Sequence, residues 1–344
     1  MTSIDVAVLD DSAICRLRLR EILEADGDIR VVAESPSGAK ILELLASTKP
    51  RVLLTDLVMP GVDGLAVVGE VMRRAPLPVI IVSAGGFTQV SAFEALRLGA
   101  LEVAKKPDHG DSRQERALRE AVRRLAGAFV VRHPGHVLPV PVAGEPPVRP
   151  GAQRVRVLGI GSSAGGPPAV ASLLGALPPE RAPAVLVAQH MPPAHVDDFA
   201  GFLSRRCRLE VRVCRHSATL TPGCVYVPGD GMNLAVIEPG RVVATPSSDS
   251  LTPSVDVLLS SMAQHHGADC AGVVLSGIGH DGRDGLRALA QRGALTIAQD
   301  EASCAVYGMP KAAAPFATHR LNPEQAARLV LSHVPQRERR APAP

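Results

Sequence analysis

The chain has 344 residues, more than the roughly 100 to 200 residues of an ordinary domain, and this length predicts two domains. Hydrophobic residues make up 46% and charged residues 21% of the sequence, a composition that favours buried cores and excludes extensive disorder. Aromatic residues reach only 2% and Trp is missing, so the stacking surfaces of single-stranded nucleic-acid binders are not expected. The net charge of +3 is spread along both halves, and we expect no nucleic-acid partner.

The sequence also predicts a cytoplasmic protein without direct membrane insertion. Its first residues lack a positively charged segment and lead directly into an apolar run. No stretch reaches the ~18 apolar residues that a membrane-spanning helix needs. The cysteines form no C-x-x-C pair and no metal-type spacing, so we expect reduced thiols at Cys15, Cys207, Cys214, Cys224, Cys270 and Cys304.

Residues 1–126 alternate between short apolar runs and longer amphipathic runs, as strands and helices do in five βα units. The runs are residues 6–9, 13–24, 31–34, 38–47, 52–55, 64–73, 79–83, 90–98, 102–104 and 113–125. This alternation predicts a parallel sheet with helices on both faces. Ligand sites in such sheets lie at the carboxyl ends of the strands.

Residues 127–153 contain six prolines and predict a semi-rigid linker. A second domain, residues 154–335, is expected to be a doubly wound parallel-sheet α/β domain, followed by a tail at 336–344. Its predicted elements are residues 155–160, 168–177, 184–188, 195–205, 272–275 and 282–292, with an irregular, β-rich stretch around 224–243.

Polar side chains mark the ends of four strands predicted in the first domain. Asp10 and Asp11 follow the first strand, Asp56 the third and Lys106 the fifth, while Ser83 ends the fourth. These ends share one rim of a parallel sheet, so we expect the side chains to form one site. Crowded carboxylates repel unless a divalent cation lies among them, and the three aspartates therefore predict a Mg²⁺ site. Asp56 is the predicted phosphoryl acceptor.

In order and spacing these residues resemble a response-regulator receiver domain over its full length. The resemblance implies a flavodoxin-like (βα)5 fold. It also implies that Asp56 accepts phosphate from a histidine kinase and that Asp10 and Asp11 help to hold Mg²⁺. Ser83 and Lys106 match the residues that carry the switch in that family.

The second domain opens with a glycine-rich loop at 159–166 that fits two motifs. Read as G-x-S-x-G, it is a nucleophile elbow that presents Ser163. Read as G-x-G-x-x-A, it is a dinucleotide-binding loop, which needs an acidic residue after the next strand. That strand ends with Gln189 and His190 instead, which favours the elbow.

A serine hydroxyl is a weak nucleophile until a neighbouring imidazole takes its proton, and His190 is the predicted base. Asp281 lies in a glycine-rich turn after the strand at 272–275. It is the predicted carboxylate that orients the imidazole. We expect backbone N–H groups of Ala164 and Ile278 to stabilise the oxyanion. No cofactor is expected for this reaction, and Cys304 is expected to be packed rather than nucleophilic.

From about residue 155 to 331 the chain resembles the catalytic domain of chemotaxis protein-glutamate methylesterases, the CheB family. The matching runs are residues 161–166, 189–193, 222–230, 253–256, 279–282 and 298–304. The resemblance implies hydrolysis of glutamate γ-methyl esters on methyl-accepting chemotaxis receptors, with release of methanol, and deamidation of receptor glutamines. It places Ser163, His190 and Asp281 at the family's catalytic positions. A chemotaxis histidine kinase is the implied phosphodonor.

The sequence departs from the two families at three places. Val103 stands where many receivers carry an aromatic switch residue, Ile278 where methylesterases usually carry Met, and Leu251-Thr252 where relatives carry His-Arg. Asp256 and Gln299 are expected either to line the pocket or to support it.

Two alternatives to the esterase hypothesis stay open. One is a response regulator without enzymatic activity, whose second domain binds a partner. The other is a nucleotide-binding output domain that uses the glycine loop. The presence of all three predicted catalytic residues argues against the first, and the missing ribose-binding acid argues against the second.

Overall fold

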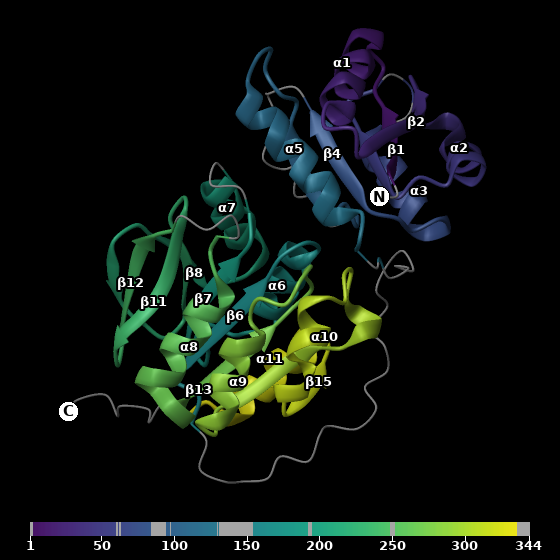
Figure 1. The fold of residues 1–344 in the computed structure, drawn as a ribbon. Coiled ribbons are helices and arrows are strands. Elements are labelled where there is room, and N and C mark those ends of the chain that lie inside the picture. Colours follow the sequence, from purple (N-terminus) through teal and green to yellow (C-terminus); the bar gives the residue numbers. More distant parts are fainter. Residues whose placement is uncertain are drawn as a thin grey trace, which may run out of the picture. The chain divides into compact units, whose positions relative to one another are not determined.

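The computed structural model describes residues 3–59, 61, 63–83, 94–96, 98–128, 130, 154–191, 195–247 and 252–335. The chain divides into two compact units, one of residues 1–141 together with 305–307 and one of residues 142–304 and 308–344 (Figure 1). The predicted tail, most of the predicted linker and most of the predicted helix at 90–98 lie outside the described residues.

The first unit is a five-stranded parallel sheet in the order β2-β1-β3-β4-β5. Helices α1 and α5 cover one face and α2 and α3 the other (Figure 1). This is the expected flavodoxin-like α/β fold. Its elements are β1 (Ile4–Leu9), α1 (Ala13–Glu24), β2 (Ile29–Ser35), η1 (Gly38–Lys40), α2 (Ile41–Thr48), β3 (Val52–Thr55), α3 (Gly64–Arg74), β4 (Val79–Ser83), β5 (Glu102–Lys105) and α5 (Ser112–Leu125).

The second unit contains a seven-stranded parallel sheet in the order β15-β14-β13-β6-β7-β10-β8. Its first elements are β6 (Val157–Ser162), α6 (Gly166–Gly175), β7 (Ala184–Gln189), α7 (Val196–Arg206), β8 (Glu210–Cys214), β9 (Ser217–Thr219), β10 (Cys224–Pro228), β11 (Met232–Glu238) and β12 (Arg241–Pro246). They are followed by α8 (Val255–His266), η3 (Gly267–Asp269), β13 (Cys270–Val274), α9 (Arg283–Gln291), β14 (Leu295–Gln299), η4 (Glu301–Ser303), α10 (Met309–Ala313), η5 (Ala314–Phe316), β15 (His319–Leu321) and α11 (Pro323–His333).

Strand β6 lies at the centre of this sheet, and the direction in which strands are added reverses there. The chain first places β7 on one side of β6 and later places β13 on the other. At such a reversal the loops that follow neighbouring strands diverge and leave room for a site. The ends of β6, β7 and β13 therefore meet at the topological switch point of the second unit.

Helix α8 packs very closely on β6 because β6 contains two glycines. A Cβ atom at Gly159 would lie 2.8 Å from a methyl group of Leu259, and one at Gly161 would lie 2.8 Å from a methyl group of Val255. Neither distance is possible between real atoms without a shift. The two glycines thus allow the N-terminal turn of α8 to approach the carboxyl end of β6.

The β-rich stretch expected around residues 224–243 divides between two sheets: β10 belongs to the parallel sheet, whereas β11 and β12 form a separate antiparallel sheet in the order β11-β12-β9. Its buried side chains Leu234, Val236 and Val242 join the core that α8 and α9 form against the parallel sheet. Strand β11 packs directly on α8. The small sheet therefore supports the helix that lies over β6.

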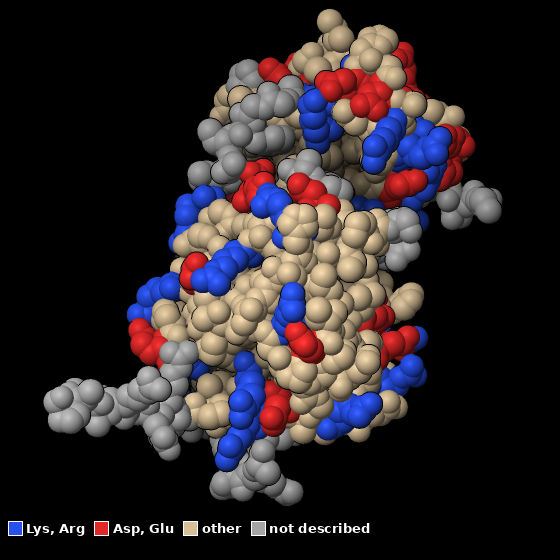
Figure 2. All heavy atoms as spheres, turned by 90° about the vertical axis from the view of Figure 1, so that its left-hand side faces the viewer, with Lys and Arg blue, Asp and Glu red and all other residues tan. Residues whose placement is uncertain are grey.

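Charged side chains are distributed over the surface in both signs. On the face that Figure 2 presents, basic and acidic side chains are interspersed (Figure 2). Exposed pairs such as Arg212 with Glu210 and Arg283 with Asp284 form ion pairs. In the described ranges, none of the helices has the length and apolar character required to cross a bilayer.

Candidate functional site

Ser163, His190 and Asp281 follow three neighbouring strands of the second unit. Ser163 comes directly after β6, His190 directly after β7, and Asp281 lies in the turn between β13 and α9. In the sheet register Gly161 of β6 is aligned with both Ala188 of β7 and Val274 of β13. The three strands thus end at the same level, and the three predicted site residues project from one edge of the sheet.

The turn that carries Ser163 is tight, and a glycine adopts its unusual backbone conformation. Gly165 has a φ of +68° and forms the N-cap of α6, whereas Ser163 stays outside the left-handed region. The Ser163 N–H donates to the carbonyl of Ser276 at 3.0 Å, and its own carbonyl accepts from the Gly166 N–H at 2.8 Å. The serine is held by its backbone, and the residue as a whole is 8% exposed.

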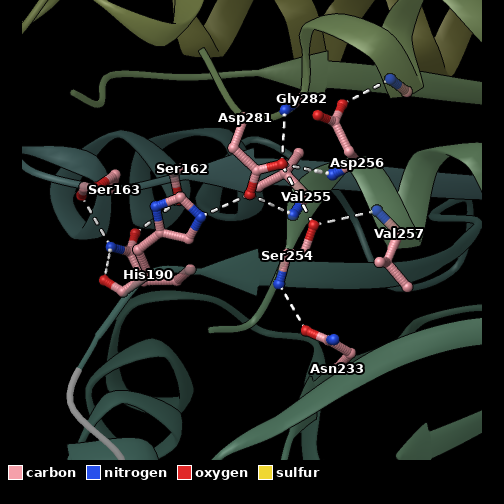
Figure 3. A network of polar contacts seen from close by, with 12 residues as sticks. Ser162, Ser163, His190, Asn233, Ser254, Val255, Asp256, Val257, Asp281 and Gly282 are labelled. Atoms are coloured by element: carbon pink, nitrogen blue, oxygen red, sulfur yellow. Dashed lines mark hydrogen bonds and ion pairs between the residues drawn. The ribbon is translucent and has the colours of Figure 1, made fainter. Parts of the chain in front are cut away.

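His190 and Asp281 are in direct contact. The imidazole Nε2 lies 2.7 Å from Asp281 Oδ2, with the two side chains 6% and 14% exposed. A carboxylate can only accept, so Nε2 carries the proton in this contact. Nδ1 is buried and has no hydrogen-bond partner among the described residues. In Figure 3 the imidazole lies between Asp281 on one side and Ser162 and Ser163 on the other (Figure 3). The nitrogen with the free lone pair is therefore Nδ1.

The N-terminal turn of α8 binds the carboxylate of Asp281. The backbone N–H of Val255 donates to Oδ2 at 2.8 Å, and that of Asp256 donates to Oδ1 at 2.8 Å. Gly282 N–H and the Ser254 hydroxyl add further bonds to Oδ1 at 3.0 and 3.3 Å. The first N–H groups of a helix have no partner within the helix and attract negative charge.

These contacts determine the charge of Asp281. Burial alone raises the pKa of this carboxyl, but hydrogen bonds from His190 and from the backbone N–H groups of Val255 and Asp256 outweigh it and lower the pKa to about 2. Asp281 is consequently ionised at any pH above about 3. An ionised carboxylate here fixes the Nε2–H tautomer of His190.

The sequence left open whether Asp256 and Gln299 line the pocket or support it. In the structure both side chains bond to backbone N–H groups of segments next to the site. Asp256 Oδ1 accepts from the Gly285 N–H in the first turn of α9 at 2.6 Å. Burial and the nearby Asp281 carboxylate raise the pKa of Asp256. Gln299 Oε1 accepts from the Ser276 N–H at 2.8 Å, and the Ser276 hydroxyl donates to the Ala164 carbonyl at 2.9 Å.

The turn that contains Ile278 is packed against Ser163. The Gly277 carbonyl accepts from the N–H groups of Gly308 and Met309 at 3.1 and 2.8 Å. A Cβ at Gly277 would lie 2.8 Å from Ser163 Cβ and would overlap the Met309 sulfur, and a Cβ at Gly308 would lie 2.6 Å from the Gly277 carbonyl oxygen. Glycine at both positions allows this turn to lie against the serine. Leu251, the first residue of the Leu251-Thr252 pair that replaces His-Arg of the relatives, lies outside the described residues.

Sequence reasoning missed three side chains that contact the site. Gln189 bonds to the loops of Ser163 and His190, Ser254 caps α8 and bonds to Asp281, and Asn233 of β11 accepts from the Ser254 N–H at 2.7 Å. Ser254 precedes an apolar helix, which is the sequence signal of an N-cap. Gln189 and Asn233 carry no such signal. Cys304 is packed as expected, and burial raises its pKa.

In the first unit the acidic residues converge as the sequence analysis expects. One carboxylate oxygen each of Asp10, Asp11 and Asp56 lie within 4.8 Å of one another. Lys106 Nζ lies 2.6 Å from Asp10 Oδ2 and 2.6 Å from Asp56 Oδ2. Ser83 ends β4 at the same rim and is 7% exposed. Three carboxylates at this separation are the oxygen ligands that Mg²⁺ prefers.

Lys106 balances much of the negative charge in this pocket. Burial alone lowers the pKa of its ammonium group, but hydrogen bonds to Asp10 and Asp56 outweigh burial and raise the pKa above its ordinary value. Asp56 is anchored on its other oxygen, because Oδ1 accepts from the Leu57 N–H at 2.6 Å. Its Oδ2 faces the ammonium group.

A receiver fold with this acidic pocket, joined to an α/β unit with a serine, a histidine and a carboxylate at one sheet edge, defines a response regulator with a hydrolase output domain. The family model of the CheB methylesterase matches residues 158–330, and that of the response regulator receiver domain matches residues 6–117. The chain belongs to the CheB family of receiver-linked methylesterases.

Named relatives match along nearly the whole chain. Protein-glutamate methylesterase/protein-glutamine glutaminase 2 of Anaeromyxobacter dehalogenans is 37% identical over 90% of this chain and 90% of its own length. The corresponding protein 1 of Myxococcus xanthus is 40% identical over 89% of this chain and 90% of its own length. The crystal structure of the Thermotoga maritima CheB methylesterase catalytic domain is 27% identical, with a TM-score of 0.49, over 52% of this chain and 99% of that one.

The depressed pKa of Asp281 predicts how stability depends on acid. The folded-state pKa of about 2 lies below the ordinary value of 3.8, so the stabilisation is present above about pH 4 and is lost as the pH falls through about 2. The Asp281→Asn variant lacks this carboxyl group. We therefore expect the free energy of unfolding of its second unit to fall by about 2 kcal/mol less between pH 5 and pH 2 than that of the wild type. Urea unfolding followed by circular dichroism between pH 5 and pH 2 measures it. The exposed Asp230→Asn is the control, and an unchanged pH profile in Asp281→Asn contradicts the assignment.

The close contact of Gly277 with Ser163 predicts a second effect. Gly277→Ala forces the turn and the serine apart, and we expect the rate of Ser163 labelling by a fluorophosphonate to fall between about tenfold and a hundredfold. Gly201→Ala on α7 is the control, because its Cβ would meet only the flexible end of Arg205 at 3.4 Å. Equal labelling rates in the two variants would show that the turn adapts without moving the serine.

Proposed function

We propose that the protein is a phosphorylation-regulated esterase that hydrolyses glutamate γ-methyl esters on methyl-accepting chemotaxis receptors and releases methanol. It also deamidates receptor glutamines, and both reactions take place in the cytoplasm. The observation that carries the proposal is the buried His190, with Nε2 bonded to an ionised Asp281 and Nδ1 left free on the side of Ser163. Family membership and the names of the relatives support the substrate class.

In the proposed reaction Ser163 Oγ attacks the ester carbonyl while His190 Nδ1 takes the hydroxyl proton. The C–O bond to the methoxy group then breaks, His190 returns the proton, and methanol leaves. Water attacks the acyl-enzyme with the same base and releases the glutamate carboxylate. A glutamine side chain follows the same path with ammonia as the leaving group. Asp281 stabilises the imidazolium form in each step.

Backbone N–H groups of Ala164 and Ile278 are the proposed donors to the oxyanion. The Ser163 N–H already donates to the Ser276 carbonyl, so Ala164 is the donor that remains in this turn next to the nucleophile. The Ile278 turn is held against Ser163 by the contacts of Gly277 with Gly308 and Met309. Because a backbone donor is independent of the side chain, Ile in place of Met preserves it. Loss of one such donor costs about 100-fold to 1000-fold in rate.

The receiver unit is proposed to accept a phosphoryl group on Asp56 from a chemotaxis histidine kinase. Asp10, Asp11 and Asp56 would hold Mg²⁺, which neutralises charge on the transferred phosphoryl oxygens when bound. Lys106 already neutralises Asp56 Oδ2 and would bond to the phosphorylated side chain, together with Ser83. Phosphorylation then shifts the population of the protein toward an active state.

The two alternatives have less support. An output domain that only binds a partner has no need of an ionised, buried carboxylate bonded to an imidazole. A nucleotide-binding loop requires an acid at the end of β7, where Gln189 and His190 stand and bond to neighbouring groups.

Methanol release from a methylated chemoreceptor fragment tests the esterase reaction. Ser163→Ala removes the nucleophile, and we expect release to fall about a thousandfold or more at unchanged stability. The control Ser204→Ala removes an exposed hydroxyl on α7 that bonds only to the Ala200 carbonyl and should keep the full rate. Release that survives in Ser163→Ala would refute the assignment of the nucleophile.

The same assay tests regulation when a small-molecule phosphodonor and Mg²⁺ are added. We expect the rate to rise for the wild type and to stay constant for Asp56→Asn, which lacks the acceptor oxygen. Asp5→Asn, at the opposite end of β1, is the control and should still respond. Phosphorylation itself is followed by the mass of the intact protein, and a phosphorylated Asp56→Asn variant would contradict the assignment.

A further inference from the structure

Gln189 is almost fully buried at the end of β7, between the loops that carry Ser163 and His190. It is 3% exposed, and its side-chain amide makes three hydrogen bonds. Buried amides normally have partners, but this one joins the two residues that must exchange a proton in the proposed reaction.

The two donors of the amide go to the two reacting residues. Gln189 Nε2 donates to the Ser163 carbonyl at 2.8 Å and to the His190 carbonyl at 2.9 Å. An amide nitrogen carries two hydrogens in a fixed plane, so a single rigid group determines the separation of the two backbone oxygens. The amide therefore adds to the backbone bond at this end of the two strands, in which the His190 N–H donates to the Ser162 carbonyl at 2.9 Å.

The acceptor end of the amide is held as well. The Ser162 hydroxyl donates to Gln189 Oε1 at 2.6 Å, and this bond fixes which end of the amide faces the two carbonyls. A Cβ at Gly166 would overlap Oε1 and lie 2.7 Å from Ser162 Cβ. Glycine at 166 therefore leaves the space that the amide occupies.

From this geometry we propose that Gln189 is a positioning residue for the esterase reaction, which sets the spacing between the backbones of Ser163 and His190 and so orients the two side chains for proton transfer. Asp281 fixes the far end of the imidazole, and Ser276 fixes the backbone of the serine. Gln189 joins these two halves. The inference rests on the proposed function. The role of Gln189 is to set a distance rather than to contact the substrate.

Fluorophosphonate labelling of Ser163 in the full-length protein tests the proposal, because it separates binding of the probe from the covalent step. Gln189→Met keeps the length of the side chain and removes its donors and acceptor. We expect the covalent rate constant to fall by about a hundredfold, as for a displacement of about 1 Å, with an unchanged dissociation constant for the probe. A covalent rate within twofold of the wild type would overturn the proposal.

Thr296→Val is a control that lowers stability without displacing Ser163 or His190. Thr296 is fully buried in β14, and its hydroxyl donates to the Phe316 carbonyl at 2.8 Å. This variant should lower the Tm comparably to Gln189→Met and keep the covalent rate within twofold. A Thr296→Val variant that loses as much covalent rate as Gln189→Met at the same Tm would reduce Gln189 to a structural residue and overturn the proposal.

Ser162→Ala decides the question if Gln189→Met does not fold. It removes only the hydroxyl that orients the amide, and we expect a fall of about tenfold in the covalent rate with unchanged probe affinity; an unchanged rate overturns the proposal. The labelling assay needs no receptor. Wild-type protein that labels normally but releases no methanol would therefore refute the proposed function and leave the test of Gln189 intact.

Discussion

A buried carboxylate loses its hydration, and the resulting cost of several kcal/mol must be offset by other bonds. For Asp281 the N-terminal turn of α8 and His190 supply these bonds. The turn reaches the carboxylate only because α8 lies close to β6 over Gly159 and Gly161. The charge state of Asp281, the tautomer of His190 and the free Nδ1 all depend on this one packing contact between a helix and a strand.

The two units place their polar groups at the same kind of position and balance the charge differently. In the receiver unit, the ammonium group of the Lys106 side chain bonds to Asp10 and Asp56. In the second unit, backbone N–H groups that cannot move away bond to Asp281. A pocket balanced by a side chain suits a carboxylate whose charge changes, whereas a pocket balanced by backbone dipoles suits a carboxylate that stays ionised.

The alternation of apolar and amphipathic runs predicted the parallel sheet of the first unit strand by strand, but in the second unit it marked only β6, β7 and β13 of the seven strands. The ends of predicted strands were sufficient to indicate Asp56, His190 and Asp281. The pattern ended the central strand at residue 160, whereas β6 continues to Ser162. Gly161 and Ser162 have little apolar character, but they pair with Ala188 and Gln189. The bonds of Gln189 could not be predicted, because they join side-chain and backbone atoms whose proximity arises only from the folded sheet.

The glycines around Ser163 limit the substitutions that this part of the fold can accept. Gly161, Gly166, Gly277 and Gly308 each face a neighbour that any side chain would strike. A side chain at any of these positions would displace the atoms that surround the nucleophile. A substitution at one glycine would therefore require a compensating change in the group that it touches, so these positions are structurally coupled to their neighbours.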